Sequence, residues 1–480
     1  MTQAVDHLAL LPLYAAAGTA LLVLIVELAF GRFQVPAGIL GGLATVACTV
    51  VAAPRSTFCT EGDCSWVGSD RAAVLAVLFA GLTAGVLAFS APALRKGLAP
   101  AGEFAFLLTC SMTGGVVVAY AGDLITLIVG LETLTLPLYV LVGLRRFAPS
   151  EKPTTTGATA SLTFFVVSVI STAIALMGAA LLYAATGQLY LRELTDGAGP
   201  FASLATAGSA LLVIGFAFKV AAVPLHAWAP ATYDGAPIPV AAYLSTASKL
   251  GGVIALAAVV VQLDTGPLVA VLAVLTMTVG NLVALRQTRM IRLLAWSSVA
   301  QAGYIIAPLA VDGPDATAAV AYAVFFVLLE LVAFGAVVAL RGPERDGGFL
   351  ADYRGAGRRS PWLGAALVLA FAGLAGLPPG LAGLFAKVTI VASLLDAGWG
   401  WLAGVVVLNA VIALAYYVRA TATLYAPTPT APAGAISVLD PKLLYPRVSV
   451  SRPVTAALAG AALIAVVAGF APQWVFDALS

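Results

Sequence analysis

Apolar runs of about 20 residues recur along nearly the whole of this 480-residue chain. A helix of that length spans the hydrocarbon core of a bilayer, because it closes all its backbone hydrogen bonds internally. Only 10% of the residues are charged, against about 25% in soluble domains. The sequence therefore predicts an all-α polytopic membrane protein that forms a single transmembrane domain over residues 1–480.

We expect fourteen membrane-spanning helices. The first run has no basic segment before it and is long enough to span, so we expect it to be retained rather than cleaved as a signal peptide. The expected spans are 8–30, 36–53, 72–89, 104–120, 124–144, 158–183, 204–223 with a continuation past a break, 240–261, 268–285, 293–311, 316–340, 362–395, 399–425 and 454–470.

The basic residues sort by side of the membrane. If the N-terminus lies outside and the spans alternate, the inner connections hold 18 of the 24 lysines and arginines, the outer ones hold three, and three lie within spans. Inner loops of membrane proteins are enriched in lysine and arginine. The pattern thus predicts that both termini lie on the outer side, and it supports the number of spans.

Two lysines, Lys219 and Lys249, lie deep in the apolar stretch 215–252, which also contains four prolines. Each lysine costs about 2.5–3.5 kcal/mol at the centre of a membrane helix. Prolines interrupt the helix and free backbone groups. A broken helix beside buried ionisable groups is typical of a site that passes ions or protons. We therefore expect the seventh span to be broken.

The twelfth span repeats this pattern. Pro378 and Pro379 interrupt it, and Lys387 follows. Two broken helices, five spans apart, predict two five-helix repeats, and the odd number makes the second inverted. The expected divisions are residues 1–103 with helices 1–3, the bundles 104–262 and 263–425, and residues 426–480 with an inner loop and helix 14.

Glu132 lies near the middle of the fifth span, where a pair with Lys219 would keep both groups ionised. Separating such a pair would favour release of the lysine proton, which arginine could not give up. The alternatives are a purely structural carboxylate and lysines that extend to the membrane surface. His226 and Glu330 are candidates for supporting roles in a proton relay, or for hydrogen-bonded structural roles.

The four cysteines form no C-x-x-C pair and no cluster, which argues against a metal or iron–sulfur centre held by this chain. Cys59 and Cys64 share a polar loop on the expected outer side, so we expect a disulfide there if the compartment is oxidising.

Two stretches carry a family resemblance: VGLETLTLPLYVLVG at 129–143 and FKVAAVPLHAWAPATYDGAPIPVAAYLSTASK at 218–249. Together with the broken helix before Lys387, they resemble the antiporter-like membrane subunits of respiratory complex I, NADH-quinone oxidoreductase. The resemblance covers nearly the whole chain and fits the subunit N branch best. It implies two inverted five-helix bundles, helices 4–8 and 9–13, and proton-transfer roles for Glu132, Lys219, Lys249 and Lys387. It also implies flavin and iron–sulfur clusters in partner subunits, with no cofactor in this chain.

The resulting hypothesis is a proton-translocating subunit in a bacterial inner membrane, with both termini on the periplasmic side. It would work beside other membrane subunits of the enzyme, including neighbouring antiporter-like subunits, and carry no redox chemistry itself. The alternatives are a subunit of a Mrp-type cation/proton antiporter or related membrane hydrogenase, and a structural membrane scaffold.

Overall fold

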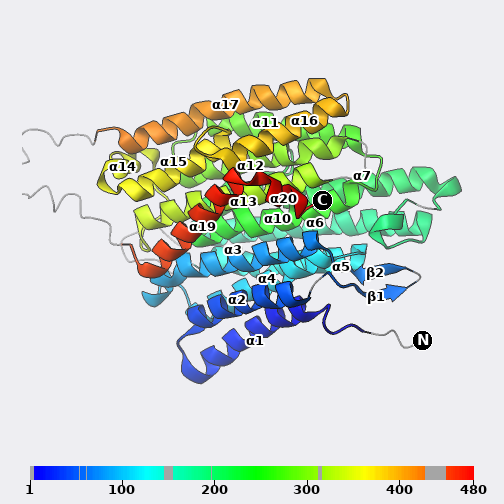
Figure 1. The fold of residues 1–480 in the computed structure, drawn as a ribbon, viewed down its shortest axis with the longest axis horizontal. Coiled ribbons are helices and arrows are strands. Elements are labelled where there is room, and N and C mark those ends of the chain that lie inside the picture. Colours follow the sequence, from blue (N-terminus) through cyan, green and yellow to red (C-terminus); the bar gives the residue numbers. More distant parts are fainter. Residues whose placement is uncertain are drawn as a thin grey trace, which may run out of the picture.

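The chain is a bundle of long helices that run along one common direction (Figure 1). Thirteen helices in the described ranges are long and apolar enough to cross a membrane. This confirms the prediction of a multi-pass, all-α membrane protein. A computed structural model describes residues 5–52, 54–60, 62–144, 155–195, 197–311, 316–427 and 450–480.

The helices and strands follow the expected order of spans. Their bounds are α1 Leu11–Phe30, α2 Gln34–Ala52, β1 Thr57–Thr60, β2 Asp63–Trp66, α3 Asp70–Arg95, α4 Ala101–Tyr120, α5 Leu124–Gly143, α6 Thr155–Thr186, α7 Ala202–Lys219, α8 Trp228–Gly235, α9 Ile238–Tyr243, α10 Lys249–Val260, α11 Gly266–Ala284, α12 Met290–Ile306, α13 Thr317–Arg341, α14 Ala356–Arg359, α15 Pro361–Ala375, α16 Leu381–Asp396, α17 Gly400–Tyr425, α19 Arg452–Phe470 and α20 Pro472–Asp477.

Thirteen expected spans correspond to these crossing helices, with ends that differ by a few residues. The expected span 362–395 instead consists of two shorter helices, α15 and α16. The inner connections expected to carry Arg145, Arg146 and Lys152, and Lys442 and Arg447, fall largely outside the described residues.

Three spans form the centre of the bundle. The spans Ile238–Val260, Met290–Ala310 and Thr317–Arg341 are each 94% buried over their most apolar window, whereas Leu11–Phe30 is 22% buried. The central spans therefore face other helices rather than lipid on nearly all sides. Polar groups on them are shielded from the hydrocarbon.

A short hairpin of β1 and β2 and the C-terminus lie at one end of the bundle, and α14 lies at the other (Figure 1). The strands are antiparallel, with Cys59 opposite Cys64 and a disulfide between them. Trp66 at the end of β2 stacks on Tyr120 at the end of α4, with ring centroids 4.4 Å apart. This contact fixes the hairpin onto the bundle.

Candidate functional site

The ammonium of Lys219, the last residue of α7, lies among oxygen atoms of α5 and α6. Its Nζ donates to Glu132 Oε1 at 2.7 Å, to Ser168 Oγ at 3.1 Å and to Thr135 Oγ1 at 3.3 Å. Thr172 also donates to Glu132 Oε1 at 2.7 Å. The lysine side chain is 5% exposed and that of the glutamate 22%. A buried charge of this kind is stable only when it is paired and fully hydrogen-bonded, as it is here.

The backbone after α7 turns sharply and its polar groups find new partners. Ala221 adopts a left-handed conformation with φ of 60°. The indole N–H of Trp228, on α8, donates to the carbonyl oxygen of Phe218 at 3.2 Å. The amide of Val223 donates to Thr276 Oγ1 at 2.9 Å. These bonds satisfy backbone groups that a broken helix leaves free inside a membrane protein, so the break is a built feature.

A π-helical turn, Leu244–Ser248, joins α9 to α10 and places Lys249 in the core. Lys249 Nζ donates to the carbonyl oxygen and to Oγ of Ser298, both at 2.6 Å. Ser245, on the π turn, donates to the same Ser298 hydroxyl at 3.2 Å. Single π turns occur often at functional sites. Here the π turn directs the Ser245 hydroxyl and the Lys249 ammonium toward Ser298 on α12.

Glu330 on α13 is fully buried. Neither of its carboxyl oxygens has a hydrogen-bond partner within the described protein, and its charge interacts with that of Lys249. Buried polar atoms without a protein partner are usually satisfied by water. Glu330 therefore marks a place in the core that suits hydration.

Lys387 on α16 binds the open end of α15. Its Nζ donates to the carbonyl oxygens of Leu374 and Ala375, each at 2.9 Å, and lies 5.0 Å from the centre of the Tyr304 ring. Gly376 ends α15 with φ of 82°, and a Cβ there would lie 2.9 Å from Cδ of the lysine. The helix break and the lysine thus form one unit.

Gln301 and Tyr417 link the surroundings of the two core lysines. Gln301 Nε2 donates to the Leu374 carbonyl at 2.9 Å and to the Tyr417 hydroxyl at 3.1 Å. The Tyr417 hydroxyl is 2.5 Å from Ser297 Oγ, and Tyr322 donates to Gln301 Oε1 at 2.5 Å. The next residue, Ser298, binds the ammonium of Lys249. The Leu374 carbonyl binds the ammonium of Lys387. The polar groups around the two lysines therefore meet at consecutive residues of α12, although no hydrogen bond among the described residues joins Ser297 to Ser298.

Lys219 and Lys249 lie on packed helices, but no hydrogen bond among the described residues joins them. Gly252, one turn after Lys249, faces the backbone of Lys219 so closely that an added Cβ would lie 2.9 Å from it. No hydrogen bond or ion pair among the described residues joins His226 to a lysine. Its ring centroid lies 5.1 Å from that of Trp296, and its Nδ1 has no hydrogen-bond partner within the described protein.

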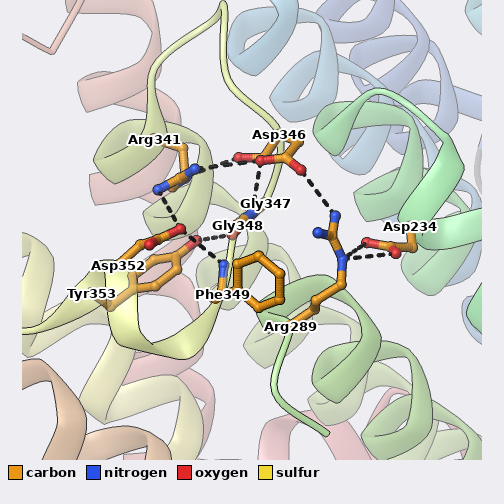
Figure 2. Close-up of polar contacts among 9 residues, drawn as sticks. All are labelled: Asp234, Arg289, Arg341, Asp346, Gly347, Gly348, Phe349, Asp352 and Tyr353. Atoms are coloured by element: carbon orange, nitrogen blue, oxygen red, sulfur yellow. Dashed lines mark hydrogen bonds and ion pairs between the residues drawn. The ribbon is translucent and has the colours of Figure 1, made fainter. Parts of the chain in front are cut away.

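An ionic cluster lies where α12 begins and α13 ends (Figure 2). Partial burial acts to raise the pKa of Asp346, but hydrogen bonds and charges from Arg289, the charge of Arg341 and the amide of Gly348 lower it overall. Sequence reasoning did not find this cluster or the Gln301–Tyr417 link. Their residues are ordinary polar side chains far apart in sequence, and only tertiary packing brings them together.

A polytopic bundle in which buried lysines accompany interrupted helices defines a class of proteins that move ions across membranes. The transmembrane family "NADH:quinone oxidoreductase/Mrp antiporter, TM" matches residues 121–413. Subunit N of NADH-quinone oxidoreductase from Salinispora tropica is 55% identical, with 99% of each chain covered. The chain belongs to this family of membrane subunits of NADH:quinone oxidoreductases and Mrp antiporters.

Solved structures agree with this assignment. A chain of respiratory complex I from Thermus thermophilus superposes with a TM-score of 0.80 at 27% identity, covering 98% of this chain and 99% of that one. A chain of the Mrp complex from Dietzia sp. has a TM-score of 0.80 at 21% identity, with 99% and 96% covered. The second similarity shows a shared fold alone.

Proposed function

We propose that this chain is a proton-translocating membrane subunit of NADH-quinone oxidoreductase and that its buried lysines carry the protons. The full-length similarity to subunit N supports the first part. The observation that carries the second is the Lys219–Glu132 ion pair at 2.7 Å, enclosed by the bundle. The partners of this chain are other membrane subunits of the enzyme. We place the flavin and the iron–sulfur clusters of the enzyme in partner subunits.

The ion pair works as the first switch. While Glu132 is paired with Lys219, both groups stay charged despite burial. If the pair separates, the desolvated ammonium loses its counter-charge and releases its proton. Thr172 and Ser168 limit this movement, because each holds one member of the pair. Glu132 is also the more exposed member, so it is the group through which a neighbouring subunit would act electrostatically.

Transfer continues through the centre of the bundle. Lys249 passes its proton to the Ser298 hydroxyl, because a hydroxyl group can donate and accept at once. Water carries it from there to the hydrogen-bonded pair of Ser297 and Tyr417. Gln301 orients this route by holding the tyrosine and the carbonyl bound by Lys387. Water bridges the gap between Lys219 and Lys249. His226 and Glu330 serve this route as supporting groups.

The proton enters on the inner side near the α7–α8 break and leaves outward past Lys387. The distribution of basic residues supports the topology that this path assumes, in which both termini lie on the periplasmic side of a bacterial plasma membrane. In the membrane, α15 and α16 together form a fourteenth crossing. Residues 104–262 and 263–425 are then inverted repeats, each with a broken helix and its lysine.

The family description also names Mrp antiporters, so the alternative is a subunit of a cation/proton antiporter. The two functions differ in what the protein assembles with. An NADH-quinone oxidoreductase subunit copurifies with flavin and iron–sulfur clusters, and its proton transport requires quinone reduction. An antiporter subunit exchanges cations for protons without either.

The test replaces Lys219 with methionine in the assembled enzyme and measures quinone reduction and proton transport in membrane vesicles. Lys219→Met should abolish most of the coupled transport. The matched control is Lys96→Met, because Lys96 is half-exposed and pairs with a surface glutamate. Normal activity and full proton stoichiometry in Lys219→Met would refute the lysine route and leave a scaffold role.

A further inference from the structure

Arg289 joins two elements that are far apart in sequence. Its Nε lies 2.9 Å from Asp234 Oδ2, at the end of α8, and its Nη2 lies 2.9 Å from Asp346 Oδ2, in the loop between α13 and α15. Figure 2 shows the guanidinium between the two carboxylates. One arginine therefore fixes the segment after the α7 break to the distant α13–α15 loop.

The loop side of this contact is held firmly. The amide of Met290 donates to the Gly348 carbonyl at 3.0 Å, and that of Leu350 donates to the Thr288 carbonyl at 2.7 Å. Arg341 pairs with Asp346 at 3.4 Å and with Asp352 at 3.3 Å (Figure 2). Several contacts therefore hold Arg289 and the α13–α15 loop together, whereas the ion pair with Asp234 is the contact that Arg289 makes to α8.

The α8 helix is short and is held at both ends. Trp228 fixes its start by donating to a carbonyl of α7, and Asp234 fixes its end. The residue before Asp234 is Tyr233, which is 1% exposed and packs edge-on against Phe334 of α13 at 6.5 Å. Any shift of Asp234 therefore moves Tyr233.

Tyr233 points toward the proton route. Its hydroxyl is buried without a well-formed hydrogen bond among the described residues. Phe334, the ring that it contacts, lies one turn after Glu330 on α13, and the tyrosine interacts with Ser245, Ser298 and Glu330. Ser298 is the residue that binds the ammonium of Lys249. The position of α8 therefore sets where this hydroxyl lies relative to Ser298.

We propose that Arg289 is a positioning residue for proton transfer: its ion pairs hold α8 so that the Tyr233 hydroxyl stays within reach of Ser298 and Glu330. The inference rests on the proposed function. Without the guanidinium, Asp234 would lose its counter-charge and face the Asp346 carboxylate, which keeps Arg341 as a partner. The end of α8 would then lose the ion pair that holds it. Loss of Asp234 alone would leave the Arg289–Asp346 pair intact and should be milder.

The experiment compares Arg289→Gln with Glu344→Gln in assembled enzyme. Glu344 provides the control because it forms an ion pair from the same loop, to Lys96, that is more than half exposed and involves neither Arg289 nor a residue of α8. We expect Arg289→Gln to lower coupled proton transport about tenfold, within the range of measured couplings through packed networks. Hydrogen exchange in residues 228–235 should rise, Arg289→Lys should restore part of both, and Glu344→Gln should change neither.

A double-variant cycle separates positioning from general destabilisation. If Arg289 acts through Tyr233, Arg289→Gln should cost little further transport in a Tyr233→Phe background. Additive losses would overturn the proposal, as would normal transport and exchange in Arg289→Gln. If Arg289→Gln fails to assemble, Asp234→Asn decides in the same cycle. Should Lys219→Met also transport normally, the proposed function falls; if only the Arg289 effects are missing, the positioning role alone falls.

Discussion

Gly252 sets how closely α10 can approach the end of α7. An added Cβ would lie 2.9 Å from the carbonyl carbon and the Cβ of Lys219, and 3.0 Å from its carbonyl oxygen. Carbon atoms pack best at about 3.5–4.0 Å, so the helices would have to separate by about 0.6 Å. These atoms belong to the backbone or are fixed to it and cannot rotate away.

The substitution Gly252→Ala should therefore affect function more than stability. Overpacking costs about 1–3 kcal/mol, and alanine regains about 1 kcal/mol over glycine within a helix. The net destabilisation is about 0–2 kcal/mol. The same displacement, if it opened the 2.7 Å bond between Lys219 and Glu132, would stretch it by about 0.6 Å, beyond the length of a good charged hydrogen bond.

The assay is thermal inactivation of the purified enzyme together with NADH-driven proton transport in vesicles. Gly404→Ala is the matched control, since Gly404 also lies within a helix but has no atom within 4 Å of an added Cβ. It should be neutral or slightly stabilising. If both variants behaved alike in both measurements, the close approach of α7 and α10 would have no role in transport.

Three further perturbations test the charged and polar network. Glu132→Gln removes the counter-charge of Lys219, and breaking a buried ion pair in this way lowers stability by about 3–5 kcal/mol. Proton transport in vesicles should fall more than tenfold in enzyme that still assembles. Gln301→Leu leaves three buried groups with one partner fewer, so thermal unfolding should show a loss of about 1–3 kcal/mol in stability, and transport should be slower. The pKa of Asp346 is lower in the folded protein than in the unfolded chain. Its contribution to stability is therefore complete above the ordinary aspartate pKa of about 3.9 and is lost as the pH falls below that value. Proteolysis of the α13–α15 loop should therefore increase on acidification, and Asp346→Asn should remove that dependence.

Three features could be predicted from the sequence: the membrane class, the order of the helices and the residues at which charge enters the core. These features follow from local properties. Transfer of an apolar run into lipid depends on its own length and composition, and prolines such as Pro378 and Pro379 interrupt a helix wherever it packs. Lys219, Lys249 and Lys387 stood out for the same reason, because each is costly in an apolar run.

The tertiary structure alone decided how these groups are connected. Nothing local indicates that Gln301 meets Tyr417 across 116 residues, that the chain forms a π turn at Leu244–Ser248, or that Arg289 selects Asp234 and Asp346 as partners. The physical reason is that a neutral or surface polar residue carries no large transfer cost to mark it. Its role is set by which helices pack together, and that depends on the whole chain.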